Sequence, residues 1–473
     1  MPEAETPDSG VLPEGWDYLK IGNFGFVTKL AGFEFTKFFN YQDEGEVRVV
    51  RILNIGFGNF IPENFKFIDR LTSSNLSRSQ LSHGDILISY VGSIGKAAIL
   101  PNDGYLYHLG PNVAKIVVNS MICDSRYLLN YILSPEGQEQ LNTTSKAVTQ
   151  SSLSMKQIRS VIVPLPPLPE QQRIVARIEG LLAHVNEARG RLQKVPVIMK
   201  QFRQGVLAAA CSGRLTEGWR EENPNIPSAF DDITELCSSR KQKPKKHFEK
   251  SPTSLPKEID VDNVDIPDSW CLANVGFLGF VTKLAGFEYT KYFHLSDSGD
   301  IPVVRAQNVQ MGKFVNSNIK FIPLETSNIL ERSQLNGNEI LIVYVGAGVG
   351  NVCLAPSEGR WHLSSNVGKI ELDWMVNKYL LFYLQSEFGL NKILSVSKAT
   401  AQPSLSMGAI RDTVVYVPPL AEQHEIVRRV DALFARAEAV EREAAAATKR
   451  AETLTQAVLG KAFRGELVTT GEG

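Results

Sequence analysis

The sequence predicts a mixed α/β (α+β) protein, in which two globular domains related by a pseudo-two-fold axis are separated by an antiparallel coiled coil of long helices. Three observations predict this class. The 473-residue chain is written twice, each copy carries strand-like runs and a short helix, and each copy ends in a long helix with a heptad pattern.

The duplication extends along the whole chain. Gly25–Phe39 returns as Gly279–Phe293 with two substitutions, and the offset of 254 residues (279 − 25) holds within two residues to the last shared motif. That motif is PPLPEQQRIV from Pro166 and PPLAEQHEIV from Pro418. Two units of this length are not solenoid repeats, so they indicate a duplicated domain-plus-helix module. A pseudo-two-fold product suits a partner with its own two-fold character, such as duplex DNA.

Each globule is expected to combine strands with a short helix. Asp85–Val91 and Glu339–Val345 are rich in branched apolar residues and stop at glycine clusters, as strands stop at turns. Short helices are expected at Tyr127–Leu133 and Tyr379–Leu384. These elements predict a globule that is neither all-α nor all-β.

The two long helices are expected to begin near Glu170 and Glu422, directly after proline clusters. Apolar residues then recur at spacings of three and four, which is typical of a coiled-coil seam, with ordinary core helices as the alternative. Pro196 stands where the second copy has Thr448, so a kink or break is expected in the first helix only. The predicted seam comprises Ile174, Ile178, Leu181, Val185 and Leu192 in the first helix and Ile426, Val430, Leu433 and Val440 in the second.

The chain divides into five predicted parts. The globules are placed at 1–165 and 266–417, and the helix regions at 166–215 and 418–473. A polar, proline-containing stretch, 216–265, is predicted to be a linker. Its basic run from Arg240 to Lys246 fits a solvated linker better than a phosphate-binding site.

Composition limits the classes of function. The net charge of −1 gives no global signature of nucleic-acid binding, so any DNA contact must come from local patches. The five cysteines have no CxxC or CxxH spacing, which supports neither a disulfide framework nor a zinc site. No signal-peptide-like start or long apolar run occurs, and a cytoplasmic location is expected.

Catalytic motifs are missing from the sequence. Gly92–Lys96 has a glycine and a lysine, but its loop is too short to wrap a phosphate chain, and Gly346–Gly350 lacks the spacing of a dinucleotide-binding loop. His108 and His362 recur in register without a nucleophile or carboxylate partner, so a structural or DNA-contacting role is expected. We interpret the chain as a binding protein without a catalytic residue or a metal site.

The order of motifs resembles the specificity (S) subunit of type I restriction–modification enzymes. The resemblance rests on the two PPLxEQ helix starts, on Leu215–Trp219 (LTEGW), on Lys461–Leu467 (KAFRGEL) and on the Gly84–Ile88 strand, and it covers essentially the whole chain. It implies a non-catalytic reader of double-stranded DNA in which each globule is a target-recognition domain. It also implies two adenine-N6 methyltransferase subunits docked on the helices, optionally joined by two ATP-dependent translocase/nuclease subunits. S-adenosylmethionine, ATP and Mg would bind to those partners, and this chain is expected to bind no cofactor.

The residue pattern suggests a split target. Helices of about 35–40 residues are on the order of 50–60 Å long, so the globules of an antiparallel pair are expected somewhat more than one DNA turn apart. The near-identity of the two globules predicts two similar half-sites in inverted orientation, each with an adenine for methylation. Leu53 aligns with Gln307, so one position is expected to differ between the halves.

Candidate DNA contacts are repeated residues with side chains suited to phosphates or base edges. For each one alone, a surface ion pair or a cap is an equally good interpretation. The candidates are Lys29, Phe33, Thr36, Lys37, Arg51, Asn54, Arg78 and Gln80 in the first copy, and Lys283, Phe287, Thr290, Lys291, Arg305, Gln307, Asn308, Arg332 and Gln334 in the second.

Two other classes of function stay open at this point. A divergent DNA methyltransferase or nuclease that acts alone would modify DNA without partners. A coiled-coil scaffold that binds only protein would not change the electrophoretic mobility of any duplex DNA.

Overall fold

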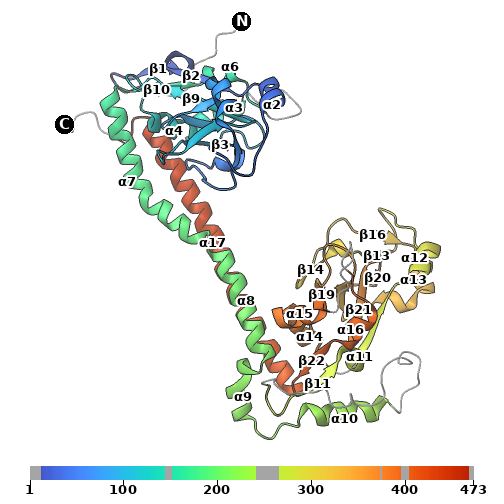
Figure 1. Ribbon diagram of the computed structural model, residues 1–473. Helices are drawn as coiled ribbons and strands as arrows, with labels where there is room; N and C mark the ends of the chain where they lie inside the picture. The colour runs from blue at the N-terminus through green and yellow to red at the C-terminus, as the bar shows by residue number, and fades with distance from the viewer. Residues whose placement is uncertain (1–11, 144–151, 241–265, 373–374, 396–403, 468–473) are drawn as a thin grey trace. The chain divides into compact units, whose positions relative to one another are not determined.

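The computed structural model describes residues 12–143, 152–240, 266–372, 375–395 and 404–467 (Figure 1). The chain divides into two compact units, of which one is Met1–Lys194 with Ala444–Gly473 and the other is Val195–Glu443. Each unit therefore contains one globule, the beginning of the helix that follows it and the end of the other long helix. The predicted mixed α/β class is confirmed.

The globule of the first unit contains two four-stranded sheets and a two-stranded ladder. Its strands are β1 (Asp17–Lys20), β2 (Gly25–Lys29), β3 (Val47–Val50), β4 (Lys66–Ile68), β5 (Gln80–Leu81), β6 (Ile86–Ser89), β7 (Ala97–Ile99), β8 (Leu106–Leu109), β9 (Val113–Val118) and β10 (Ile162–Leu165). One sheet has the order β2-β9-β6-β7 and the other β4-β3-β8-β5, in which β3 and β8 are parallel. The ladder pairs β1 with β10 and so joins the start of the globule to the segment that leads into the long helix.

Helices of the first unit cover these sheets and continue away from them. They are α1 (Ile21–Phe24), α2 (Gly32–Phe38), η1 (Ile52–Asn54), α3 (Arg70–Asn75), η2 (Ser77–Ser79), α4 (Ser125–Leu133), α5 (Pro135–Thr143), α6 (Met155–Ser160) and α7 (Leu168–Leu192). The expected strand at Asp85–Val91 and helix at Tyr127–Leu133 are confirmed as β6 and α4. Buried tyrosines tie α4 to β10, because the Tyr127 and Tyr131 hydroxyls donate to the Pro164 and Ile162 carbonyl oxygens at 2.6 and 2.7 Å.

The second unit repeats this plan. Its strands are β11 (Cys271–Asn274), β12 (Gly279–Lys283), β13 (Ile301–Val304), β14 (Val309–Gln310), β15 (Lys313–Phe314), β16 (Lys320–Ile322), β17 (Gln334–Leu335), β18 (Ile340–Val343), β19 (Val352–Leu354), β20 (Trp361–Leu363), β21 (Val367–Leu372) and β22 (Val414–Val417). The sheets have the orders β12-β21-β18-β19 and β16-β13-β20-β17, and β11 pairs with β22.

The helices of the second unit include one that both units share. They are α8 (Val195–Cys211), η3 (Arg214–Thr216), α9 (Glu217–Glu222), α10 (Ala229–Arg240), α11 (Val275–Leu278), α12 (Gly286–Tyr292), η4 (Ala306–Asn308), α13 (Leu324–Ile329), η5 (Glu331–Ser333), α14 (Asn377–Gln385), α15 (Glu387–Ser395), α16 (Met407–Asp412) and α17 (Leu420–Phe463). The unit boundary falls within α17, after Glu443. No helix in the described ranges is long and apolar enough to cross a membrane.

Two predictions about the long helices and the linker have different outcomes. The first helix is broken between Leu192 and Val195, next to Pro196, whereas α17 is continuous, so the predicted break is confirmed. The predicted linker 216–265 is wrong in its first part. α9 and α10 lie there, and Ile233 is buried in the core of the second unit because one face of α10 is apolar. The basic stretch Lys241–Lys246 lies outside the described residues.

A buried glutamine fixes the direction in which each long helix leaves its globule. The Gln171 side chain donates to the Pro166 carbonyl oxygen at 2.8 Å and accepts from the Asp124 N–H at 2.9 Å. Gln423 donates to the Pro418 carbonyl oxygen at 2.9 Å and accepts a backbone N–H in the same way. Both amides are buried, and a buried amide is costly unless its donors and acceptor are paired. The repeated glutamine is therefore a structural residue.

The glutamate before each glutamine is also buried, and it holds the start of the globule against the helix. Glu170 accepts the indole N–H of Trp16 at 3.2 Å. Glu422 accepts the indole N–H of Trp270 at 2.8 Å and a guanidinium N–H of Arg220 at 2.5 Å. The carboxylate also lies in the first turn of its helix, where the dipole favours a negative charge.

The predicted seam of the first helix needs a correction. Ile174 and Ile178 are buried, but they pack into the core of their own globule. Further along α7, Leu182 is the buried leucine, and Leu181 is 39 % exposed. The reason is that this part of the helix covers a broad globular core and not a single partner helix, which widens and rotates the apolar face.

The second helix shows the same deviation. Ile426 and Val430 are buried in the core of the second globule, and Leu433 packs against it partly buried. Val440 is exposed, so it is not a buried seam residue. In the first helix Val185 packs partly buried against the core, and Leu192 is half-buried.

The end of each long helix is part of the other module's unit. In the first unit Leu459, Ala462 and Phe463 of α17 are buried, and the Phe463 ring lies edge-on to Tyr127 and Tyr131 at 5.2 and 5.1 Å. In the second unit the end of α8 is buried against α14 and the start of α17.

The helices in the second unit run antiparallel. The Arg203 guanidinium binds both carboxylate oxygens of Glu441 at 2.7 and 2.8 Å. Leu215, twelve residues later, accepts a hydrogen bond at 2.8 Å from Arg429, which lies twelve residues before Glu441. The antiparallel direction predicted for the helix pair is therefore seen within this unit.

We expect Gln423→Ala to lower the free energy of unfolding of the second unit by about 2–4 kcal/mol, because it leaves the half-buried Val376 N–H and the buried Pro418 carbonyl without partners. Thermal and denaturant unfolding of the purified chain measure this. His424→Ala is the matched control, since His424 is exposed on the same turn. Equal stability of the two variants would contradict the structural role of Gln423.

Candidate nucleic-acid interface

The helices α2 and α12 each present an aromatic ring and a lysine to solvent. Phe33 and Phe287 are 70 % and 72 % exposed, although both are large apolar side chains. Lys37 and Lys291 are exposed on the same helices, with their ammonium groups 5.1 and 4.9 Å from the ring centroid of the following residue. The same exposed ring and cation thus recur in both units, which makes them candidates for a contact that the two units share.

Further repeated residues lie near these helices. Lys29 and Lys283 end the strands before them, and each ammonium group lies 4.6 Å from the centroid of a tyrosine ring. Thr36 and Thr290 are on α2 and α12, where each hydroxyl donates to a backbone carbonyl one turn earlier at 3.0 Å. The lysines are therefore positioned by rings, and the threonine hydroxyl protons are already used within the helix.

Arg78 and Arg332 are joined to the same helices by ion pairs. Arg78 lies 3.4 Å from Glu34 of α2, and Arg332 lies 3.1 Å from Glu288 of α12. The two arginine side chains are 54 % and 50 % exposed, so they can exchange the carboxylate for a phosphate. The structure thus brings these two arginines together with the candidates on α2 and α12.

Gln80 and Gln334 are less available. The Gln80 side chain donates to the Ser73 hydroxyl at 3.3 Å, and the Gln334 side chain donates to the Ser327 carbonyl oxygen at 2.8 Å. Both glutamines are half-buried. Their bonds hold the strand that follows η2 or η5.

The prediction that Asn54 and Asn308 read adenine is wrong. Both are fully buried, and the Asn54 side chain donates to two backbone carbonyl oxygens, at 3.1 and 2.8 Å, and accepts the Arg51 N–H at 2.9 Å. Asn308 makes the same three bonds, with Arg305 as its N–H donor. The hydrogen bonds that an adenine would need are already made inside the protein.

Arg51 and Arg305 belong to the same framework. A terminal guanidinium nitrogen of Arg51 donates to the Asn64 carbonyl oxygen, and that of Arg305 to the Asn318 carbonyl oxygen. The guanine-reading role predicted for these arginines is not supported by this geometry. Gln307, by contrast, is exposed.

His108 and His362 are structural residues, which was one of the two predicted roles. Both are fully buried in the β3-β8 and β13-β20 sheets. The His108 Nδ1 lies 2.9 Å from the Leu109 carbonyl oxygen and the His362 Nδ1 lies 2.8 Å from that of Leu363. Burial lowers the pKa of both imidazoles, so the neutral form is favoured.

The sequence of the chain also matches a known protein family. The family model described as "Type I restriction modification DNA specificity domain" matches residues 13–196 and 275–447. The chain belongs to this family. The matched residues cover the first globule from Pro13, the second globule from Val275, and the start of both long helices.

Relatives in the specificity-domain family support the assignment over most of the chain. The EcoBI specificity subunit of Escherichia coli is 27% identical, with 96% of this chain and 87% of the relative covered. The EcoKI specificity subunit of E. coli K12 is 24% identical, covering 97% and 90%. These relatives are specificity subunits of restriction enzymes, and the prediction that the chain is such a subunit and not a catalytic one is confirmed.

The fold is also found in a solved structure. A chain from a study of the assembly and conformational transition of the type I R-M system is 18% identical, has a TM-score of 0.64, and covers 97% of this chain and 100% of its own length. At this identity the likeness concerns the fold.

Two buried lysines were missed by sequence reasoning. Lys115 and Lys369 are buried in the sheets, and their ammonium groups donate to the Gln80 and Gln334 carbonyl oxygens at 2.5 and 2.8 Å. Lys115 also lies 3.5 Å from Asp85. The repeat of each lysine was the only signal in the sequence. Both support the segment that carries Arg78 or Arg332.

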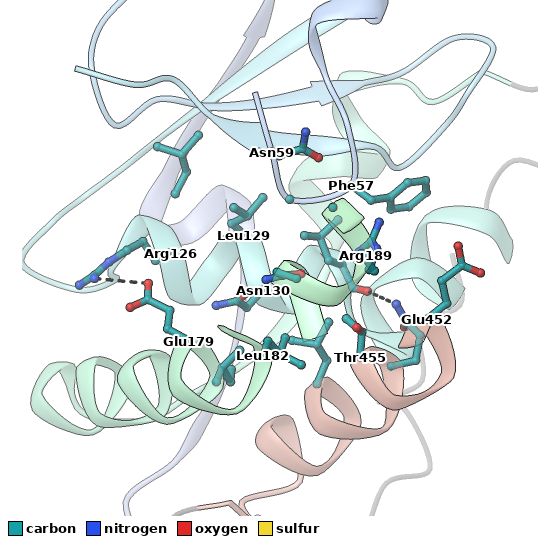
Figure 2. A pocket seen from close by; sticks show the side chains of 18 of the residues that line it. Phe57, Asn59, Arg126, Leu129, Asn130, Glu179, Leu182, Arg189, Glu452 and Thr455 are labelled. Atoms are coloured by element: carbon teal, nitrogen blue, oxygen red, sulfur yellow. Dashed lines mark hydrogen bonds and ion pairs between the residues drawn. The ribbon is translucent and has the colours of Figure 1, made fainter. Parts of the chain in front are cut away.

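A large cavity of about 1030 Å³ lies in the first unit, between the globule, α7 and the end of α17 (Figure 2). Leu129 and Leu182 line it, and Arg126 pairs with Glu179 at its edge at 3.6 Å. Phe57 and Asn59, from the loop after η1, lie at the globule side of this cavity. The cavity carries no catalytic arrangement. Within the described residues, no group of three or more His, Cys, Asp or Glu is placed to hold a metal ion.

We expect Asn54→Ala to lower the unfolding free energy of the first unit by about 2–3 kcal/mol, because the loop carbonyls lose their buried donor. The adjacent Leu53→Ala should change it by about 0.5 kcal/mol or less, since Leu53 is exposed. Thermal unfolding of both purified variants measures this contrast. An Asn54→Ala variant as stable as the unaltered chain would contradict the structural role of Asn54 and make it a candidate DNA contact again.

Proposed function

We propose that the chain is the sequence-specific DNA-binding subunit of a type I restriction–modification complex and that it reads a split site with two similar, inverted half-sites. Two adenine-N6 methyltransferase subunits dock on its long helices, with or without two ATP-dependent translocase/nuclease subunits. S-adenosylmethionine, ATP and Mg bind to those partners, and the complex works in the cytoplasm. The observation that carries the proposal is the exposed, repeated set on α2 and α12.

The chemistry of this set suits duplex DNA. Lys37 and Lys291 supply cations for phosphates, as do Arg78 and Arg332, which form ion pairs with glutamates. These local cations can bind DNA although the net charge of the chain is −1. An exposed ring such as Phe33 can pack against a thymine methyl group or enter between base steps. Because the same side chains are exposed in both units, the two half-sites should share the features that they contact.

The long helices offer apolar surface to partner subunits. In the first unit Leu181 and Leu454 are exposed, and in the second unit Val197 and Val440 are exposed. Apolar side chains on both units fit one methyltransferase on each. The exchange of helix ends between the modules supports an inverted order of the half-sites, because each unit then pairs one helix start with one helix end.

We expect Phe33→Ala combined with Phe287→Ala to weaken binding of the complex to its target duplex by about tenfold or more, since two contact rings are removed. Fluorescence anisotropy with target and scrambled duplexes measures this. Leu71→Ala is the matched control, because Leu71 is as exposed as the phenylalanines but has Glu325 as its counterpart. Unchanged affinity of the double variant, or an equal loss in the control, would exclude α2 and α12 from the interface.

The target itself tests the whole proposal. We expect N6-methyladenine mapping in a host that carries the chain and its methyltransferase to give one motif, with two similar inverted halves around an unread spacer. A continuous motif or two unrelated halves would contradict the split-site model. Methyl transfer to DNA by the purified chain without a partner would contradict the assignment of catalysis to another subunit.

A further inference from the structure

We propose that the turn after β3 and β13 is a specificity element in which one exposed side chain, Leu53 or Gln307, reads a base that differs between the half-sites. This inference rests on the proposed function. It goes beyond that function because it names the residue pair that makes the two globules different readers.

The turn Arg51–Asn54, with its counterpart Arg305–Asn308, is called here the framed turn. In the first unit the Ile61 N–H donates to the Asn54 carbonyl oxygen at 2.9 Å, in addition to the three bonds of the Asn54 side chain. In the second unit the Val315 N–H donates to the Asn308 carbonyl oxygen at 2.8 Å. The same atoms are bonded in both units, so the backbone of the turn is held in one shape.

The frame presents different side chains on this common shape. Asn54 and Asn308 point inward and are identical, whereas the residue before each is exposed and differs: Leu53 is 44 % exposed, and Gln307 is also exposed. A rigid backbone with a variable exposed residue places each side chain with little loss of conformational entropy on binding.

The surroundings of Leu53 differ from those of Gln307 in a way that suits different bases. A cavity of about 430 Å³ is lined by Leu53, Arg51 and Lys96. When the β6-β7 pair of the first unit is aligned with the β18-β19 pair of the second, Asn351 takes the place of Lys96. The Asn351 side chain donates to the Val309 carbonyl oxygen at 3.3 Å. The first unit therefore places the apolar side chain of Leu53 near Lys96. In the second unit the exposed residue is the amide Gln307, and Asn351 stands at the position of the lysine.

These differences predict distinct base contacts. Leucine can contact only the methyl group of thymine, whereas glutamine can bond adenine N6 and N7 together. The candidate contacts Phe33 and Lys37 of α2 are unchanged in α12 and suit what the half-sites share. The framed turn is a place where an identical backbone carries a different exposed residue, and so it suits a base that the half-sites do not share.

The test exchanges the two residues in the complex of the full chain with its methyltransferase. Leu53→Gln and, separately, Gln307→Leu are compared with the unaltered chain by selection of bound duplexes from a randomised pool, followed by sequencing. Leu53→Gln should change the preference at one position of one half-site from thymine toward adenine by about tenfold, and Gln307→Leu should make the reverse change in the other half.

Asn59→Lys is the matched control, because it also copies the second unit, which has Lys313 there, but Asn59 lies at the large cavity of Figure 2. It should leave the motif unchanged. A split wild-type motif that persists in both exchange variants overturns the inference and leaves the proposed function intact, as does a wild-type motif with identical halves. A wild-type complex that selects no motif contradicts the proposed function and this inference together.

Discussion

The orientation of each globule on its helix depends on a buried polar cluster at the PPLxEQ motif. Gln171 and Gln423 bond the loop that precedes the long helix, and Glu170 and Glu422 bond a tryptophan from the start of the globule. Buried polar groups of this kind have few alternative partners, so they specify one geometry where apolar packing alone would accept several. The second cluster has further bonds: Glu422 also accepts from Thr216 of η3 and from Arg220 of α9. The end of one helix is thereby locked to the start of the other.

In the proposed reading surface, the duplication separates constant from variable parts. Phe33 and Lys37 of α2 recur on α12 and are proposed to meet both half-sites in the same way, while the turn after β3 and β13 holds a different side chain on the same backbone. The repeat therefore allows a comparison within one molecule: the buried Asn54 is unchanged in the second unit as Asn308, whereas the exposed Leu53 is replaced by Gln307. Asn54 and Leu53, which are adjacent, fall on opposite sides of this division.

Much of the fold follows from local sequence signals. Runs of branched apolar residues that end at glycine predicted β6 and β18, and Pro196 predicted the break before α8. The burial of Asn54 could not be predicted from the sequence. The residue type tells which hydrogen bonds a side chain can make, but not whether its partners lie within the same chain. The shift from Leu181 to Leu182 was missed for a related reason: heptad spacing assumes a helix as the partner, and α7 meets a globule. The amphipathic α10 was hidden in a stretch whose overall composition is polar.

The exchange of helix ends has a consequence for the order in which the protein is made. The first globule is synthesised first, yet its core contains Leu459, Ala462 and Phe463, which leave the ribosome only after the whole second globule. Until then Tyr127 and Tyr131 lack the ring that packs against them. The second globule already has its α8 contacts when its own residues emerge. The module translated first is thus completed last, and only a chain translated to the end of α17 closes both cores.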